Sequence, residues 1–299
     1  AVVTEILNHL LKHPLKSKYE NINKDGDNVF MLFIKSQYTN ECKYVLNNYP
    51  EYKLDQVNVW GDTALMLSIK TMSTASLPLT ILNSNPNMCN LDQVNNEGNT
   101  VLILAIKNRC TAVWSEILTN NIDRCKLDHV DNEGNTALIL SIKINNSTIN
   151  SEILKNGDKC KLDHVDNEGN TALILAVKCN YNSTCLTILK NYDKCKLDHV
   201  NNEGNTALIL AIKNGHNSVC SEILKNCNKC KLDHVDNKGN TALMYAIQLK
   251  NTDIRNIILK SLLDCGLDKV NSDGNTALTM SIKLEMSRCY ELILKSSFD

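Results

Sequence analysis

The chain has 299 residues with 32 basic and 33 acidic side chains, and this balance excludes a global field that draws in nucleic acid or an anionic membrane surface. Thirteen cysteines are an odd number in a chain much longer than most disulfide-stapled scaffolds, which favours a reducing compartment over a secreted disulfide framework. No apolar run reaches the roughly 18 residues that a membrane span needs, so we expect a soluble, intracellular, cytoplasmic protein without a membrane partner.

One sequence pattern recurs along the chain. Five segments carry almost the same string, LDHVDNEGNTALIL from Leu127, and successive copies begin 35 residues apart, while looser copies begin at Tyr19, Leu54 and Leu91. Alignment of the copies places eight of the eleven glycines at one position: Gly26, Gly61, Gly98, Gly134, Gly169, Gly204, Gly239 and Gly274. We predict that residues 1–18 hold the second helix of an incomplete leading repeat. About eight repeats then follow, at 19–53, 54–90, 91–126, 127–161, 162–196, 197–231, 232–266 and 267–299.

Each copy predicts the same local elements in the same order. An Asp or Asn three residues before the glycine is turn chemistry and indicates a short hairpin tip. The Thr two residues after the glycine, such as Thr136, can cap a new helix, and Asn28 takes this place in the first copy. A first helix such as Ala137–Lys143 and a second such as 218–225 follow. Neither can bury its apolar face alone, so we predict an all-α solenoid of helix-turn-helix units joined by hairpin loops.

The pattern resembles the ankyrin-repeat family, whose signature runs D-x-x-G-x-T-P-L-H-x-A. The best-matching stretch, DNKGNTALMYA from Asp236, lacks the Pro and the His, and the connection between repeats is two residues longer than the common 33-residue form. The resemblance implies a non-enzymatic scaffold that binds another protein on a concave face made by hairpin tips and first helices. It extends to the large ankyrin families of giant DNA viruses and of some intracellular parasites or bacteria, which implies a host factor as the partner and a host cell or virus particle as the location.

Two sets of residues that occupy equivalent positions in successive copies, here called columns, are of types that bind metal ions. Cysteines such as Cys230 lie two residues before the hairpin leucine, and histidines such as His234 lie two residues after it. Stacked helices lie about 8 to 10 Å apart, too far for neighbouring repeats to share zinc ligands at about 2.0 to 2.3 Å. One local set, Cys227, Cys230 and His234, lacks a fourth ligand. We therefore predict no metal and no cofactor, with cysteine filling a small gap and histidine stacking along the hairpins.

Catalytic residues are not predicted. The sequence has no G-x-x-x-x-G-K-S/T, G-x-S-x-G, H-E-x-x-H or G-x-G-x-x-G motif. An active site also needs unlike groups converging on one point, whereas these residues repeat every 35 positions. We expect neither an enzyme nor a small-molecule substrate.

The resemblance places two columns of the first helix on the binding face. One is cationic: Lys70, Lys107, Lys143, Lys178 and Lys213. The other is apolar: Leu104, Leu140, Leu175, Leu210 and Tyr245. Such a surface would suit an amphipathic helix or an acidic segment. The alternatives are that the leucines are core and that the lysines form a solvated face balanced by hairpin glutamates. Trp60, at a hairpin tip, is the aromatic anchor candidate, whereas Trp114 is expected to pack between helices.

Two other functions stay open. The array could be a structural protein that self-associates through its ends or its apolar column, and light scattering would test this. The lysine column could instead hold nucleic acid, in which case binding would weaken steeply as salt rises. Protein binding is the leading hypothesis.

Overall fold

The computed structural model describes residues 22–49, 52–71, 76–84, 89–261 and 265–296. The predicted leading helix at 1–18 lies outside these residues. The chain divides into two compact units, 1–132 and 133–299, each described here by itself.

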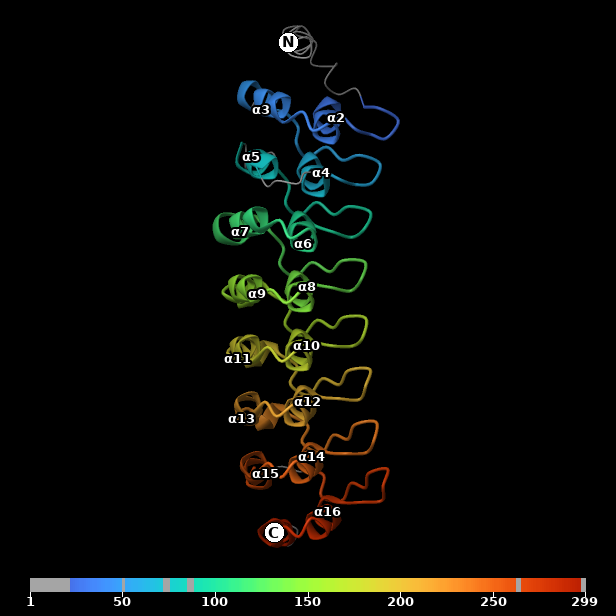
Figure 1. Cartoon of the computed structure of the whole chain (residues 1–299), viewed down its shortest axis with the longest axis vertical. Coiled ribbons are helices and arrows are strands. Elements are labelled where there is room, and N and C mark those ends of the chain that lie inside the picture. Colours follow the sequence, from blue (N-terminus) through green and yellow to red (C-terminus); the bar gives the residue numbers. More distant parts are fainter. Residues whose placement is uncertain (1–21, 50–51, 72–75, 85–88, 262–264, 297–299) are drawn as a thin grey trace. The chain divides into compact units, whose positions relative to one another are not determined.

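The first unit consists of helix pairs (Figure 1). First and second helices pack against each other, and each also packs on its counterpart in the next pair. The pairs are α2 (Val29–Lys35) with α3 (Thr39–Asn48), α4 (Ala64–Thr71) with α5 (Ser76–Ser84), and α6 (Val101–Lys107) with α7 (Thr111–Asn120). A short 3-10 helix, η3 (Ile122–Arg124), follows α7.

The second unit repeats this arrangement, with the first helices in one layer, the second helices in another, and hairpins projecting from the first-helix layer (Figure 1). Its pairs are α8 (Ala137–Lys143) with α9 (Ser147–Leu154), α10 (Ala172–Lys178) with α11 (Asn182–Leu189), α12 (Ala207–Lys213) with α13 (Asn217–Leu224), α14 (Ala242–Gln248) with α15 (Thr252–Leu259), and α16 (Ala277–Lys283) with α17 (Ser287–Ser296). Its 3-10 helices are η4 (Gly157–Lys159), η5 (Tyr192–Lys194) and η6 (Cys227–Lys229). They occupy the connection that is two residues longer than in the common ankyrin repeat.

The predicted helix starts are confirmed. Thr136 accepts a hydrogen bond from the backbone N–H of Ile139, and Asn28 caps α2 in the same way through Met31. The first helix ends when a residue such as Asn145, at φ 58°, takes the left-handed conformation. This residue caps the C-terminus of the first helix, and the second helix begins within a few residues.

The hairpin tips are also confirmed. Gly61 has φ +74°, donates its N–H to the carbonyl of Asn58 at 2.9 Å, and lies between Val57 and Thr63, which form an isolated antiparallel bridge. Among the described residues such bridges are the only β structure, so the fold is all-α.

Candidate binding face

The hairpins of each unit are joined to one another by a column of histidines. His164 Nε2 lies 3.0 Å from the carbonyl oxygen of Gly134, and His199 and His234 make the same contact to Gly169 and Gly204 at 2.8 and 2.9 Å. Because a carbonyl only accepts, Nε2 must carry a proton. The predicted stacking of histidines along the hairpins is therefore a hydrogen bond from each hairpin to the preceding tip.

A second link between hairpins is a pair of Asp or Asn residues, here named the Asx pair. One member follows the glycine of one hairpin, and the other lies three residues before the glycine of the next. In the first unit, Asn95 Nδ2 donates to Asp62 Oδ1 at 2.8 Å, and both side chains are buried. Asp or Asn stands at both positions in seven successive hairpin pairs: Asp27/Asn58, Asp62/Asn95, Asn99/Asp131, Asn135/Asp166, Asn170/Asn201, Asn205/Asp236 and Asn240/Asn271. Direct side-chain hydrogen bonds also join Asp27 to Asn58, Asn170 to Asn201 and Asn240 to Asn271.

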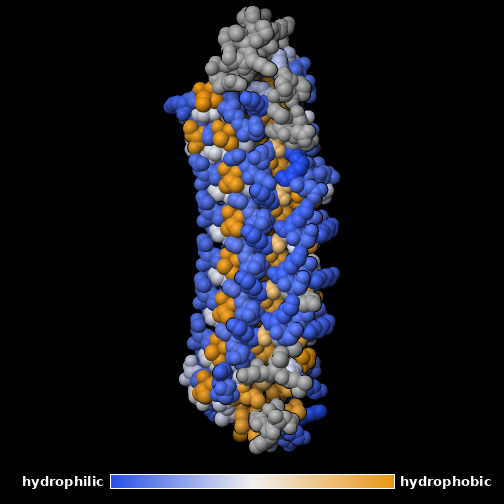
Figure 2. All heavy atoms as spheres, turned by 180° about the vertical axis from the view of Figure 1, so that it is seen from behind, coloured by the Kyte–Doolittle hydropathy of each residue, from blue (hydrophilic) through white to orange (hydrophobic). Residues whose placement is uncertain are grey.

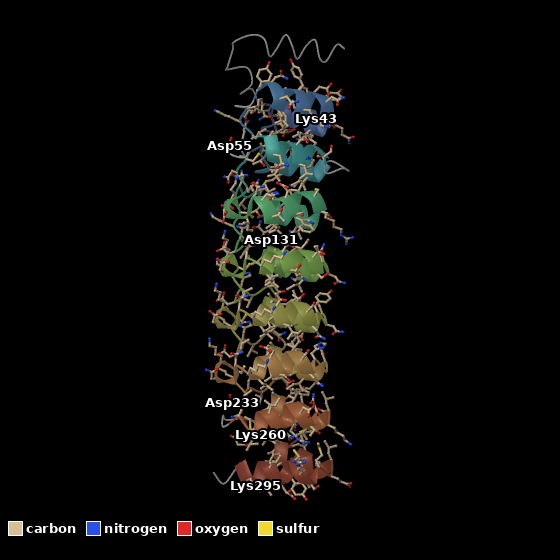
Figure 3. All side chains as sticks on the ribbon, turned by 90° about the vertical axis from the view of Figure 1, so that its left-hand side faces the viewer. Lys43, Asp55, Asp131, Asp233, Lys260 and Lys295 are labelled. Atoms are coloured by element: carbon tan, nitrogen blue, oxygen red, sulfur yellow. The ribbon has the colours of Figure 1, made fainter. Side chains whose placement is uncertain are left out.

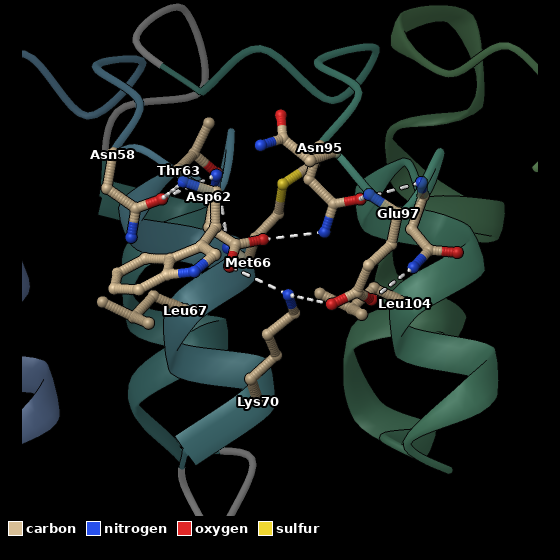
Figure 4. A network of polar contacts seen from close by, with 12 residues as sticks. Asn58, Asp62, Thr63, Met66, Leu67, Lys70, Asn95, Glu97 and Leu104 are labelled. Atoms are coloured by element: carbon tan, nitrogen blue, oxygen red, sulfur yellow. Dashed lines mark hydrogen bonds and ion pairs between the residues drawn. The ribbon is translucent and has the colours of Figure 1, made fainter. Parts of the chain in front are cut away.

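The predicted lysines extend from the first helices to these pairs. Lys70 Nζ lies 2.9 Å from Asp62 Oδ2 and 3.1 Å from Glu97 Oε1 (Figure 4). Lys143 Nζ lies 3.0 Å from Asp166 Oδ2 and donates to Asn135 Oδ1 at 2.9 Å. Each lysine therefore ties its helix to a hairpin.

Charge is matched within these networks. No Asx pair carries two aspartates, and every pair that carries one has a lysine beside it. Lys107 lies 3.0 Å from Asp131 and Lys213 lies 3.7 Å from Asp236. A buried carboxylate is costly unless it is paired, so each lysine offsets the burial of one aspartate.

Two of the seven Asx pairs contain only asparagine. Beside Asn240/Asn271 the lysine is replaced by Gln248, which keeps the set neutral. Beside Asn170/Asn201 the cation Lys178 remains, and its ammonium lies 2.7 Å from Glu203 and 3.5 Å from Glu168. Both glutamates are exposed at hairpin tips, so the Lys178 ion pairs are at the surface.

These contacts shift several pKa values. Burial alone would raise the pKa of Asp166, but the backbone amides of Asn170 and Glu168 and the Lys143 ammonium outweigh burial and lower it. The hydrogen bond to Glu203 raises the pKa of Lys178. Both groups are therefore held in their charged forms at neutral pH.

The predicted apolar column lies in the core. The exposed fractions are 2% for Leu104, 7% for Leu140, 6% for Leu175, 6% for Leu210 and 8% for Tyr245. In α8, Leu140 and Lys143 are three residues apart and share a helix face. The burial of the apolar column corresponds to the alternative in which the leucines are core. The Tyr245 ring has Lys213 Nζ 5.0 Å from its centroid.

The two tryptophans behave differently. Trp60 is 47% exposed at its hairpin tip, with Lys35 Nζ 4.7 Å from its ring centroid. Trp114 is 4% exposed in α7, which confirms that it packs between helices. The face seen in Figure 2 is largely hydrophilic, with apolar side chains only in narrow patches. Of the two tryptophans, only Trp60 is exposed to solvent.

The cysteine column is structural. Cys195 is buried, its Sγ donates to the carbonyl of Asn191 at 3.4 Å, and burial raises its pKa to about 12. Cys160 and Cys230 make the same contact to Asn156 and Asn226. Among the described residues no group of three or more candidate ligands could hold a metal ion. The side chain of Cys227, from the one suggestive metal set, lies outside the described residues.

Two further signals are present in the sequence but absent from the predictions. One is that adjacent copies never place Asp at both members of an Asx pair. The other is a lysine column at the end of the second helices, seen at Lys260 and Lys295 in Figure 3. Its members are Lys155, Lys190, Lys225, Lys260 and Lys295. A cation there stabilises the negative end of the helix dipole.

Comparison with known proteins identifies the family. The chain matches the model for ankyrin repeats (three copies) over residues 115–199, 142–233, 182–261 and 228–299. These matches cover more than half of the chain, which therefore belongs to the ankyrin-repeat family. Ankyrin repeats generally mediate protein–protein interactions, and proteins of this family are typically non-enzymatic scaffolds.

Two solved structures share the fold. An ankyrin repeat domain from Acinetobacter baumannii AYE is 24% identical with a TM-score of 0.51, and the alignment covers 66% of this chain and 97% of that one. The ankyrin repeat protein EF0377 is 22% identical with a TM-score of 0.51, over 64% and 96% of the two chains. No curated protein matches the sequence. None of the described helices is long and apolar enough to cross a membrane.

Proposed function

We propose that the chain is a non-enzymatic scaffold that binds another protein on the face made by its hairpin tips and first helices. The supporting observation is that buried Asx pairs and histidine contacts fix the hairpins, whereas the residue just before the glycine changes from Trp60 through four consecutive glutamates to Lys238. This column reads Asp25, Trp60, Glu97, Glu133, Glu168, Glu203, Lys238 and Asp273. A rigid frame that presents varied side chains limits the entropy lost on binding.

Trp60 is the proposed anchor in the first unit. Its ring is 47% exposed and already ordered by the Lys35 ammonium 4.7 Å away. Tryptophan is enriched among the residues that dominate binding energy. Removal of this side chain should therefore weaken partner binding more than removal of a charged tip residue.

Among the predicted lysines, Lys178 is the proposed contact. Its partners Glu168 and Glu203 are exposed and can exchange for an acidic residue of another protein, whereas Lys143 and Lys213 offset buried aspartates. We do not propose the buried leucines as contacts. A host protein is the partner that the sequence resemblance predicts.

Site-specific photo-crosslinking tests this proposal. A photoreactive phenylalanine analogue at position 60 or 203 lies on the proposed face, and the same analogue at Thr119 or Ser151, exposed on second helices, is the matched control. We expect a discrete protein adduct only from positions 60 and 203. Adducts of equal yield from the control positions would contradict the proposed face.

Self-association is the second candidate, supported by one observation. Ile282 of α16 is 54% exposed, whereas the equivalent Ile212 and Ile247 are fully buried. If this surface joins two copies, light scattering of the full chain will show a dimer that Ile282→Glu converts to a monomer. If the original chain and the Ile282→Glu variant are both monomers at micromolar concentration, self-association is contradicted.

A further inference from the structure

The repeat pattern changes around α14, on the hairpin and first-helix face of the second unit. Lys238 takes the tip position that is glutamate in the three preceding hairpins of this unit. Gln248 takes the position of the bridging lysine, and Tyr245 replaces a leucine. Three positions of one repeat thus differ together, although their counterparts in the preceding copies of the unit are identical.

These residues line a pocket of about 330 Å³ between the hairpins and first helices of α14 and α16. One wall has Lys238, Tyr245 and Gln248, and the other has Asp273, Met280 and Lys283. The volume lies at the lower end of the range for small-molecule sites, so it can accept one large side chain and part of its neighbour.

The two lysines of the pocket have no carboxylate partner in the described part of the chain. The Lys283 ammonium donates to the neutral amide of Asn275 at 2.5 Å, and no ion pair involves Lys238. In the same unit, by contrast, Lys143, Lys178 and Lys213 each lie within ion-pair distance of an acid. With Asp273 as its one acidic residue, the pocket carries a net charge of +1.

The remaining polar groups of the pocket are largely committed. Asn271 Nδ2 donates to Asn240 Oδ1 at 2.9 Å, and the Tyr245 hydroxyl donates to Asp236 at 2.6 Å. The Tyr245 ring and the side chains of Met280 and Leu284 form the apolar part of the lining. The exposed polar groups that remain for a ligand are the two ammonium groups, the amide of Gln248 and the carboxylate of Asp273.

We propose that this pocket binds an acidic side chain in an extended segment of a partner protein, with a neighbouring apolar residue against Tyr245 and Met280. The inference rests on the proposed scaffold function. A carboxylate satisfies the lysines and accepts from Gln248, and charge-assisted bonds of this kind are stronger than neutral ones. A nucleic acid backbone would need a row of cations, and here Glu203 and Asp273 occupy the two adjacent tips.

Methionine methyl NMR of the full chain tests the proposal. The probes are the capped peptides Gly-Ser-Leu-Glu-Leu-Gly-Ser and its twin with glutamine in place of glutamate. We expect the glutamate peptide to shift the Met280 methyl signal and leave that of buried Met66 unchanged, and the glutamine twin to bind at least about tenfold more weakly. Equal shifts with both peptides, or no shift at millimolar peptide, would overturn the proposal.

Charge variants locate the binding site. Lys238→Glu restores the residue of the preceding hairpins, and it should raise the Kd of the glutamate peptide at least about tenfold, as should Lys283→Glu. Lys190→Glu makes the same charge change at the end of α11 and should leave the Kd within about twofold. If Lys190→Glu weakens binding equally, the peptide responds to net charge and the pocket is not its site. An oligothymidylate that shifts Met280 at lower concentration than the peptide would also overturn a protein partner.

The crosslinking experiment separates this inference from the proposed function. If a Lys238→Glu chain still gives the adduct at position 203 but Met280 never responds to the glutamate peptide, the pocket inference fails and the scaffold stands. If the hairpin face yields no adduct above the control positions although the peptide binds, the proposed face fails.

Discussion

The interface between the α8 and α10 hairpins and the interface between the α14 and α16 hairpins share one geometry and differ in chemistry. The first has Asn135, Asp166 and Lys143, with the ammonium 3.0 Å from the carboxylate. The second replaces the ion pair with amides: Asn271 donates to Asn240 at 2.9 Å, and Gln248 takes the lysine position. Both sets are neutral. The same frame therefore accommodates either an ion-paired set or an all-amide set at this position.

The two interfaces also differ in how tightly the hairpin tips pack. A Cβ added at Gly204 would lie 2.9 Å from the backbone nitrogen of Asn237 and closer still to its side chain, whereas a Cβ at Gly274 would meet nothing within 4 Å. The inner hairpins are covered by the next tip, and the α16 hairpin is open. Lys283, which has no carboxylate partner in the described part of the chain, belongs to the repeat with this open hairpin.

Replacement of the tip glycines should give the largest effect. Gly204 and Gly274 have φ of +78° and +74°, so alanine costs about 1 kcal/mol at either for the left-handed backbone. At Gly204 the added methyl also clashes with Asn237, and we expect a total loss of about 3 kcal/mol. Hydrogen exchange of the α12 amides measures the loss of stability in Gly204→Ala, and hydrogen exchange of the α16 amides measures the loss in Gly274→Ala. Equal losses would show that tip packing contributes nothing to stability.

Removal of the bridging lysine should give the next largest effect. Lys143→Met keeps the aliphatic stem but leaves the fully buried Asp166 carboxylate without its cation, and we expect a loss of about 2 kcal/mol in the unfolding free energy. Lys283→Met is the matched control and should cost less than about 0.5 kcal/mol. Urea unfolding of the full chain gives both values. Similar losses would contradict the assignment of Lys143 as the partner of a buried charge.

The ion-paired interface should also be the more acid-sensitive. Because the folded-state pKa of Asp166 is lowered, its stabilisation is present above the unfolded pKa of about 3.9 and is lost as pH falls through the folded value. We expect the α8 and α10 amides to lose about 1 kcal/mol of protection over this range, and Asp166→Asn to abolish the pH dependence. Hydrogen exchange at several pH values measures this. An unchanged slope in the variant would assign the loss to another carboxyl group.

Local structure was largely predictable from the sequence, because helix caps and turns depend on residues a few positions apart. The predicted helix Ala137–Lys143 is α8, and the predicted helix 218–225 differs from α13 by one residue at each end. The hairpin glycines and threonine caps also follow from neighbours in the chain. These features need no knowledge of how repeats pack.

The candidate binding face was less predictable, because its contacts between hairpins join residues about 30 to 33 positions apart. The family resemblance placed Leu140 on the face, but its side chain is only 7% exposed. The partner of Asn135 across the interface is set by packing rather than by spacing. The available signal was covariation between copies: Asp, Asn and Lys change together so that each set stays neutral or is balanced by surface glutamates.

Conversion of the amide interface into the ion-paired type should give the smallest net effect. Asn271→Asp alone buries a carboxylate without a cation and should cost about 1 to 2 kcal/mol. Gln248→Lys alone adds a surface cation and should change stability by less than about 0.5 kcal/mol. Together they recreate the arrangement of Asp166 and Lys143, so we expect the double variant to unfold within about 0.5 kcal/mol of the original, with a coupling energy of at least about 1 kcal/mol. Additive losses in urea unfolding would mean that the two interfaces are not interchangeable, and that the amide set is specific to the pocket beside α14.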